Sequence, residues 1–160
     1  HRVPANIVGD GQSSVQELVN QKNKDPRRGK NYKKPLEKIQ IGVQELAVLS
    51  AQGFTIESVP NAGEQAWLRQ NSNISTGGDS LDYTDKVDEG YKAIAEKAAQ
   101  TLGAKVCGVD MMLSDFSQEP HDENYTIIEC NYNPVLYFHD FPYEGNNRTV
   151  APYILDLLGL

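Results

Sequence analysis

The sequence lacks the features that mark a membrane, secreted or disulfide-rich protein. No apolar run in its 160 residues approaches the roughly 18 residues that a membrane helix needs, and His1–Pro4 do not begin a charged-then-apolar signal peptide. Cysteine occurs only at Cys107 and Cys130, without CxxC spacing, so neither a zinc site nor a disulfide framework is indicated. We therefore expect a soluble, cytoplasmic protein with buried, reduced thiols.

An overall excess of positive charge is also absent. The net charge of -7 and the pI near 4.9 argue against a general nucleic-acid-binding protein. Residues 1–70 carry 10 Lys/Arg against 7 Asp/Glu, whereas residues 71–160 carry 5 against 15. This asymmetry suits a protein that binds an anionic ligand with one part and a cation with another. The alternative is two solvent faces that merely differ in charge.

The length and the 39% hydrophobic content suffice for one compact domain with a real core. The chain begins at His1 with a strand-like segment already under way, so we expect a piece of a longer protein. Apolar spacing predicts helices and strands, and two of the strands, 54–59 and 65–68, are expected to form a hairpin. The helices are expected at 14–23, around 46–51, at 85–102 and at 153–158, and the other strands at 105–113 and 125–130.

Residues 24–38 form a polar, basic stretch that contains Pro26, Gly29 and Pro35. No helical or strand periodicity is present, so the stretch is predicted to be a loop. It is either a patch for a polyanion or a solvated surface insertion, and we favour the insertion.

Two acidic residues lie in the predicted strands 105–113 and 125–130. If these strands form an antiparallel hairpin, Asp110 lies opposite residue 128 or 129, which makes Asp110 and Glu129 neighbours. Adjacent carboxylates repel, and a divalent cation removes that repulsion. Asp110, Glu129 and Asn131 offer only oxygen ligands, which favours Mg²⁺ or Mn²⁺ over zinc. The alternative is that both acids lie at exposed strand edges or pair with Lys105.

A second motif, residues 69–78 (RQNSNISTGG), combines a guanidinium, amides, hydroxyls and two glycines. Backbone amides of glycines can approach an anion closely. A Gly-Gly pair alone is a weak signal. Together with an oxygen-only cation site, however, the motif indicates phosphoryl chemistry, because Mg²⁺ is usually shared between one or two carboxylates and substrate phosphates.

Six segments together resemble the ATP-grasp ligase module of the bifunctional glutamate-cysteine ligase/glutathione synthetase family. They are RVPANIVGDG (2–11), NKDPRRG (23–29), LRQNSNISTGGDS (68–80), GVD (108–110), ECNYNP (129–134) and HDFPYEGNNR (139–148). The resemblance covers essentially the whole chain, and cyanophycin synthetase is the next most similar ligase. The resemblance to the glutathione synthetase family implies that residues 1–160 form the later (C-terminal) portion of an ATP-grasp domain. The expected fold class is α+β, with a mostly antiparallel sheet and flanking helices.

The resemblance also implies roles for individual residues. Asp110, Glu129 and Asn131 would hold two Mg²⁺ ions, or Mn²⁺, that bridge the phosphates of ATP. Arg69 would stabilise the transferred phosphoryl group, and Asn71 would act with it in a loop that closes over substrate. The other expected nucleotide-binding residues are Arg2, Ser75, Thr76, Gly77 and Gly78.

The reaction that this resemblance implies joins γ-glutamylcysteine and glycine to glutathione through an acyl phosphate. The family's ATP-grasp module also has an earlier portion that carries phosphate-binding lysines and clasps adenine. Because that portion is not in this chain, we expect the upstream polypeptide to be a necessary partner and the isolated chain to have little activity. The alternatives are a cyanophycin-synthetase-like ligase and a noncatalytic folding unit or interaction module. Cys130 is expected to be a structural core thiol rather than a catalytic one. His139 is expected to have a structural or substrate-contact role rather than to act as a base.

Overall fold

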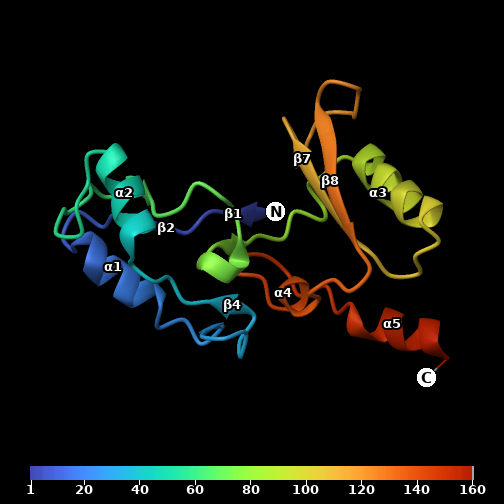
Figure 1. The fold of residues 1–160 in the computed structure, drawn as a ribbon, viewed down its shortest axis with the longest axis horizontal. Helices are drawn as coiled ribbons and strands as arrows, with labels where there is room; N and C mark the ends of the chain where they lie inside the picture. The colour runs from blue at the N-terminus through green and yellow to red at the C-terminus, as the bar shows by residue number, and fades with distance from the viewer. Residues whose placement is uncertain (160) are drawn as a thin grey trace. The chain divides into compact units, whose positions relative to one another are not determined.

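The computed structural model describes residues 1–159, which form two compact units (Figure 1). Unit 1 contains residues 1–81 and 141–147, and unit 2 contains residues 82–140 and the segment from Arg148 onward. Helices and short strands occur in both units, so the α+β class expected from the sequence is confirmed. No helix of the described residues is long and apolar enough to cross a membrane.

The strands of unit 1 form three separate pairs rather than one sheet. Two pairs are antiparallel and one is parallel, and the hairpin of unit 2 is a further antiparallel pair. The predominance of antiparallel pairing agrees with expectation, although a continuous sheet does not form among the described residues. The pairs of unit 1 are β1 (Arg2–Val3) with β6 (Asp79–Ser80), β2 (Asn6–Val8) with β5 (Gln65–Trp67), and the parallel pair β3 (Arg28–Gly29) with β4 (Leu36–Glu37).

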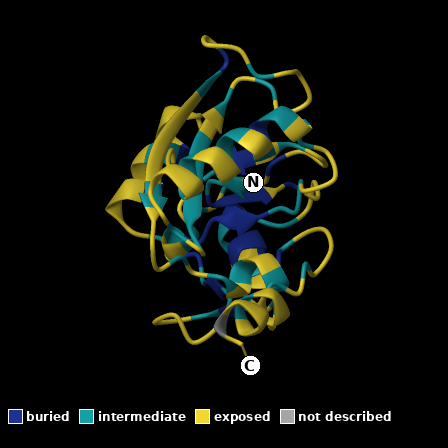
Figure 2. Ribbon diagram, turned by 90° about the vertical axis from the view of Figure 1, so that its right-hand side faces the viewer, coloured by how far each residue is buried: buried dark blue, intermediate teal, exposed yellow. Residues whose placement is uncertain are grey.

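Helix α1 (Val15–Lys22) begins at a capping box, as the Ser14–Glu17 spacing predicts. The Ser14 side chain accepts a hydrogen bond from the amide of Glu17, and the Glu17 carboxylate accepts one from the amide of Ser14 at 2.8 Å. The apolar face of α1 packs into the core of unit 1. That core consists of Ala5, Ile7, Val15, Leu18, Val19, Ile39, Leu49, Ala66 and Leu68. Figure 2 shows the buried segments of the chain in dark blue.

Helix α2 (Val43–Ala51) ends where the sequence predicts it to end. Gly53 adopts a φ of +82°, and the amide of Phe54 donates to the carbonyl of Leu49 at 3.0 Å. This left-handed glycine cap satisfies a carbonyl group that the last helical turn leaves without a partner.

The prediction that residues 54–59 and 65–68 form a hairpin is wrong. β5 pairs with β2 instead, and residues 54–59 form no strand. The carbonyl groups of Ile56 and Ser58 accept hydrogen bonds from the amides of Gln16 and Val15, at 3.0 and 2.9 Å. The segment therefore satisfies the free N–H groups in the first turn of α1, which local sequence spacing did not reveal.

Residues 24–38, expected to be a surface loop, contain two short strands and several buried side chains. β3 and β4 lie within this segment, and Arg28, Leu36 and Glu37 are buried. The polar composition concealed these elements because a charged residue is buried only when distant partners neutralise it.

In unit 2, helix α3 (Glu89–Thr101) lies alongside a hairpin of β7 (Gly108–Leu113) and β8 (Tyr125–Asn131) (Figure 1). The helix begins later than the expected residue 85, because the Asp88 side chain caps it by accepting from the amide of Gly90 at 2.8 Å. The short helices α4 (Tyr137–Asp140) and α5 (Ala151–Leu158) complete the unit.

Candidate functional site

The β7–β8 hairpin brings Asp110 and Glu129 together. The two residues are direct partners in the antiparallel register, and Gly108 is the partner of Asn131. Glu129 and Asn131 are two residues apart on one strand and so share a face. The cross-strand pairing expected from the sequence is therefore present.

A β-bulge lies directly beside the carboxylate pair. The register shifts between Asp110 and Met111, so that Met111 pairs with Ile127 and Ile128 is left as the additional residue. A bulge increases the local twist and redirects the neighbouring side chains. Here it redirects the chain at the step where the two carboxylates meet.

The carboxylate pair is accessible rather than enclosed. Asp110 is half-buried, whereas Glu129 and Asn131 are exposed, so the penalty for deep burial does not apply. The Asn131 side-chain amide donates to Glu129 Oε1 at 2.9 Å, which orients both groups. Within residues 1–159 no group of three or more His, Cys, Asp or Glu side chains could hold a metal. Two carboxylates and an amide oxygen nevertheless fit Mg²⁺, which completes its shell with waters and phosphate oxygens.

The two thiols lie at the same end of the hairpin. Both Cys107 and Cys130 are free and half-buried, close to the buried state expected for them. Burial, and secondarily the neighbouring Cys107, raises the pKa of the Cys130 thiol. A raised pKa disfavours the reactive thiolate, which agrees with a structural role.

The glycine-rich segment 69–78, here called the glycine loop, belongs to unit 1 and contains a short 3-10 helix, η1 (Ile74–Thr76). The Thr76 hydroxyl donates to the carbonyl of Asn73 at 3.0 Å. Asn71 and Ser75 are exposed. Arg2 of β1 is the register partner of Ser80 in β6, the strand that follows the loop.

Gly77 and Gly78 do not present the open anion cradle that the sequence suggested. Their amides donate to the carbonyls of Ile74 and Asn73, each at 3.1 Å. Both residues are buried, and a Cβ on Gly77 would lie 2.8 Å from Cα of Ile39. The two glycines are required because the backbone packs too closely for any side chain.

Arg69 is held in place by helix α2. Its Nε donates to a carboxylate oxygen of Glu45, and its Nη1 donates to the Gln44 side chain. The Glu45 side chain is almost fully buried, whereas that of Arg69 is partly exposed. The guanidinium is thus fixed at the beginning of the glycine loop, with an orientation set by two side chains of one helix.

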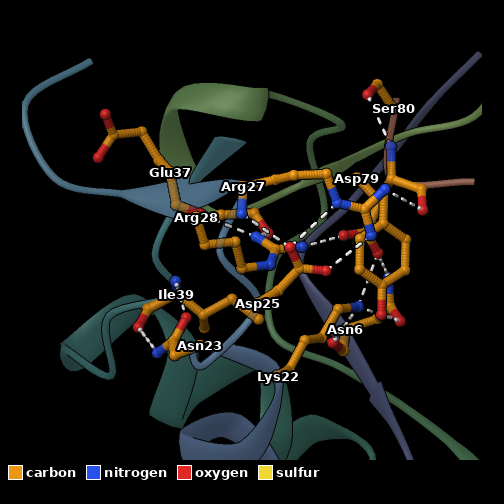
Figure 3. Close-up of polar contacts among 12 residues, drawn as sticks. Asn6, Lys22, Asn23, Asp25, Arg27, Arg28, Glu37, Ile39, Asp79 and Ser80 are labelled. Carbon is orange, nitrogen blue, oxygen red and sulfur yellow. Dashed lines mark hydrogen bonds and ion pairs between the residues drawn. The ribbon is translucent and has the colours of Figure 1, made fainter. Parts of the chain in front are cut away.

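A buried ionic cluster, which sequence reasoning missed, supports the other end of the loop (Figure 3). We call Asn6, Lys22, Arg28 and Asp79 the Asp79 cluster. Asp79 accepts from Lys22 Nζ at 2.6 Å, from Asn6 Nδ2 at 3.1 Å and from the guanidinium of Arg28. Arg28 also donates to the carbonyl of Gly77 at 3.1 Å. The cluster therefore ties β2, α1 and β3 to the end of the glycine loop.

The electrostatics of the Asp79 cluster follow from its burial. Exposed fractions are 10% for the Lys22 side chain, 0% for Arg28 and 5% for Asp79. Burial lowers the pKa of Lys22, and the nearby carboxylate of Asp79 opposes that effect. No local pattern around Arg28 or Asp79 predicts this pairing, because the two residues are 51 positions apart.

Residues 141–147 return to unit 1 and contact the same cations. The Arg27 guanidinium donates to the carbonyl of Tyr143 at 2.9 Å, and the Tyr143 ring lies 4.9 Å from Lys22 Nζ and 5.3 Å from Arg28 Cζ. Burial raises the pKa of the Tyr143 hydroxyl. Aromatic faces attract cations, so this segment stabilises the charged side chains that anchor the loop.

Comparisons with known proteins agree with the resemblance seen in the sequence, although no protein-family model matches the chain. The chain is 52% identical over 158 residues to the glutathione biosynthesis bifunctional protein GshAB of Clostridium perfringens, and 51% identical over 159 residues to that of Desulfotalea psychrophila. Each alignment covers 99% of this chain and 20% of the relative.

The structural comparison gives the same result. A crystal structure of a bifunctional glutathione synthetase from Pasteurella multocida superposes with a TM-score of 0.90 at 44% identity. The match covers 99% of this chain and 22% of that protein. The chain thus spans about a fifth of the length of the relatives it matches. Over nearly its whole length it is homologous to one segment of the bifunctional glutathione biosynthesis proteins.

Proposed function

We propose that this chain is the metal-binding part of an ATP-dependent ligase that joins γ-glutamylcysteine and glycine to give glutathione. The observation that carries the proposal is the oxygen-only ligand set of Asp110, Glu129 and Asn131 at the bulged hairpin. The similar proteins are glutathione biosynthesis proteins, which supports glutathione as the product. The two free cysteines agree with a reducing compartment, and we propose a cytoplasmic location.

The proposed reaction has two steps. A carboxylate oxygen of γ-glutamylcysteine attacks the terminal phosphorus of ATP, which forms an acyl phosphate and releases ADP. The amine of glycine then attacks the acyl carbon, phosphate leaves, and the amine loses a proton. Carboxylates are poor electrophiles at physiological pH, so the phosphorylation creates the leaving group that the second step needs.

In this proposal Asp110, Glu129 and Asn131 hold two Mg²⁺ ions, with Mn²⁺ as a possible substitute. Bound Mg²⁺ would neutralise phosphate charge and align the reacting oxygens. The ligand residues contribute fixed positions, because both strands and the Asn131–Glu129 hydrogen bond hold the donor atoms in place. Such preorganisation reduces the reorganisation that the transition state requires.

Residues of the glycine loop take the remaining roles. Arg69, oriented by Glu45 and Gln44, would stabilise charge on the transferred phosphoryl group. The exposed Asn71 and Ser75, together with Thr76, would contact substrate as the loop closes and excludes water from the acyl phosphate. Arg2, beside the end of the loop, would contact phosphate. Gly77 and Gly78 would act by allowing the loop to pack, not by donating their amides.

Metal binding can be tested on the ¹⁵N-labelled chain by Mn²⁺ titration. Paramagnetic broadening should begin at the amides of β7 and β8 around Asp110 and Glu129. Glu129→Gln removes a ligand charge while keeping the shape, and it should weaken Mn²⁺ affinity about tenfold or more. Glu119→Gln makes the same charge change in the exposed loop between the strands and should alter the affinity less than about twofold.

Broadening that is the same in Glu129→Gln and wild type would remove the metal assignment. Equal losses of Mn²⁺ affinity in Glu129→Gln and Glu119→Gln would indicate only nonspecific attraction to an acidic surface. Because the chain spans about a fifth of its relatives, we further propose weak ATP affinity and little ligase turnover for the 160-residue chain. Coupled measurement of ADP release with both substrates tests this, and robust turnover contradicts it.

A further inference from the structure

A cavity of about 620 Å³ lies in unit 1, between the end of α1, the segment around β3 and the residues after β4. This volume is in the range of small-ligand sites. None of its lining residues belongs to the metal site or the glycine loop. Its charged lining residues are Lys24, Asp25, Arg28, Lys30 and Lys38.

The one acidic group among these is already neutralised. Asp25 accepts from Arg27 twice, from Nε at 3.0 Å and from Nη2 at 2.7 Å. This bidentate contact lowers the pKa of Asp25, so the carboxylate stays ionised and committed to Arg27. The cavity therefore keeps the positive charge of its lysines.

Arg28 is the buried cation among the lining residues. Its side chain is fully buried, and its Nη atoms donate to Asp79, to the carbonyl of Glu37 and to the carbonyl of Gly77. Among the described residues, its Nε is the only buried side-chain nitrogen or oxygen without a hydrogen-bond partner. The Arg28 side chain has no exposed surface, so Arg28 belongs to the inner wall of the cavity and the lysines supply the accessible charge.

The cavity wall is rigid where it meets the helix. Asn23, just after α1, donates to the carbonyl of Ile39 and accepts from its amide, both at 2.8 Å (Figure 3). This closed pair of hydrogen bonds fixes the two sides of the cavity relative to each other. A fixed wall lowers the ordering cost of binding.

The three lysines supply charge at the opening. Lys24 and Lys30 are exposed and Lys38 is half-buried, and no ion pair of any of them is found in the described part of the chain. Together with Arg28 and the neutralised Asp25, they surround a space that also contains the apolar side chains of Pro26 and Ile39. The arrangement suits a ligand with several negative charges and a small organic part.

We propose that this cavity binds a small organic diphosphate, at a site separate from the metal-bearing hairpin. Two linked phosphoryl groups provide the two or three charges that match the lysines. The polyanion role that composition alone made the less favoured alternative for residues 24–38 thus becomes the better interpretation. The proposal does not depend on the ligase activity.

Inorganic pyrophosphate is the probe, added without divalent metal to the ¹⁵N-labelled chain and followed by amide chemical shifts. We expect saturable shifts at residues 23–30 and 38–40, with weaker binding of inorganic phosphate. Lys30→Gln combined with Lys38→Gln should raise the pyrophosphate Kd about three- to tenfold. The matched control, Lys33→Gln with Lys34→Gln, removes the same charge from the same segment outside the cavity and should change Kd less than twofold.

The dispersed amide spectrum of each variant shows whether it is folded. Linear, nonsaturable shifts, shifts confined to other parts of the chain, or equal weakening in both double variants would overturn the proposal. Equal affinity for phosphate and pyrophosphate would overturn the diphosphate assignment. Because Glu129→Gln leaves these residues intact, unchanged pyrophosphate binding in that variant separates this site from the proposed metal site.

Discussion

Gly77 illustrates how one residue controls the path of the glycine loop. It adopts a φ of +93° directly after η1, and a Cβ there would lie 2.8 Å from the backbone of Ile39. The left-handed conformation and the close contact are two separate reasons for glycine. Arg28 adds a third constraint, because it donates to the Gly77 carbonyl from inside the Asp79 cluster.

The cost of the left-handed conformation and the cost of the close contact with Ile39 can be separated by comparing Gly77→Ala with Gly63→Ala. Gly63 also has a positive φ, +81°, but a Cβ there would meet nothing within 4 Å. We expect Gly63→Ala to lower the free energy of unfolding by about 1–2 kcal/mol, from backbone strain alone. Gly77→Ala should lower it by about 1–3 kcal/mol more, because Ile39 must move. Urea unfolding measures both, and equal losses would contradict the close packing.

At the scale of an element, the capping box of α1 couples helix stability to pH. Hydrogen bonds from the amide and hydroxyl of Ser14 lower the pKa of the Glu17 carboxylate below its usual value of 4.5. The folded state therefore binds the proton less readily than the unfolded chain does. The stabilisation is fully present above the unfolded pKa and is lost as pH falls through the folded one.

Glu17→Gln should therefore make the free energy of unfolding less dependent on pH between about pH 5 and pH 3. The variant and the wild type should differ most near neutral pH and converge in acid. The control is Glu57→Gln, which removes the same charge from an exposed position outside any helix cap. Urea unfolding at a series of pH values measures the slopes, and identical slopes in Glu17→Gln and wild type would refute the coupling.

The whole molecule has an uneven core. The buried apolar cluster belongs to unit 1, and Tyr91 is the one buried apolar side chain of unit 2 among the residues whose burial is described. In unit 2, Met112 and Ile128 of the hairpin are 66% and 57% exposed. Because apolar burial is the main stabilising contribution to folding, unit 1 should open less readily than the hairpin.

Native-state hydrogen exchange of the chain tests this difference. Amides of Ile7, Leu49 and Leu68 should have the largest protection factors, about a hundredfold or more above those of Ile127 and Ile128. The bulge increases the contrast, because it interrupts the ladder at Ile128. Comparable protection of the hairpin and the unit 1 core would show that the hairpin is stabilised by contacts beyond those described.

Features that depend on near neighbours were predictable from the sequence. The capping box at Ser14, the glycine stop at Gly53 and the pairing of Asp110 with Glu129 each arise within about twenty residues. Backbone geometry and local hydrogen bonding decide such features. The three residues of the proposed oxygen-only ligand set could be grouped for the same reason, since one hairpin supplies them all.

Only the tertiary structure decided which charges are buried and which glycines serve packing. Arg28 lies in a stretch that composition describes as solvated, yet Asp79 neutralises it from 51 residues away. Arg28 also donates to the carbonyl of Gly77 and so fixes the end of the glycine loop. The sequence by itself determined the local elements and the residue types of the proposed metal site. Burial of a charge, by contrast, depends on distant partners that no local pattern contains.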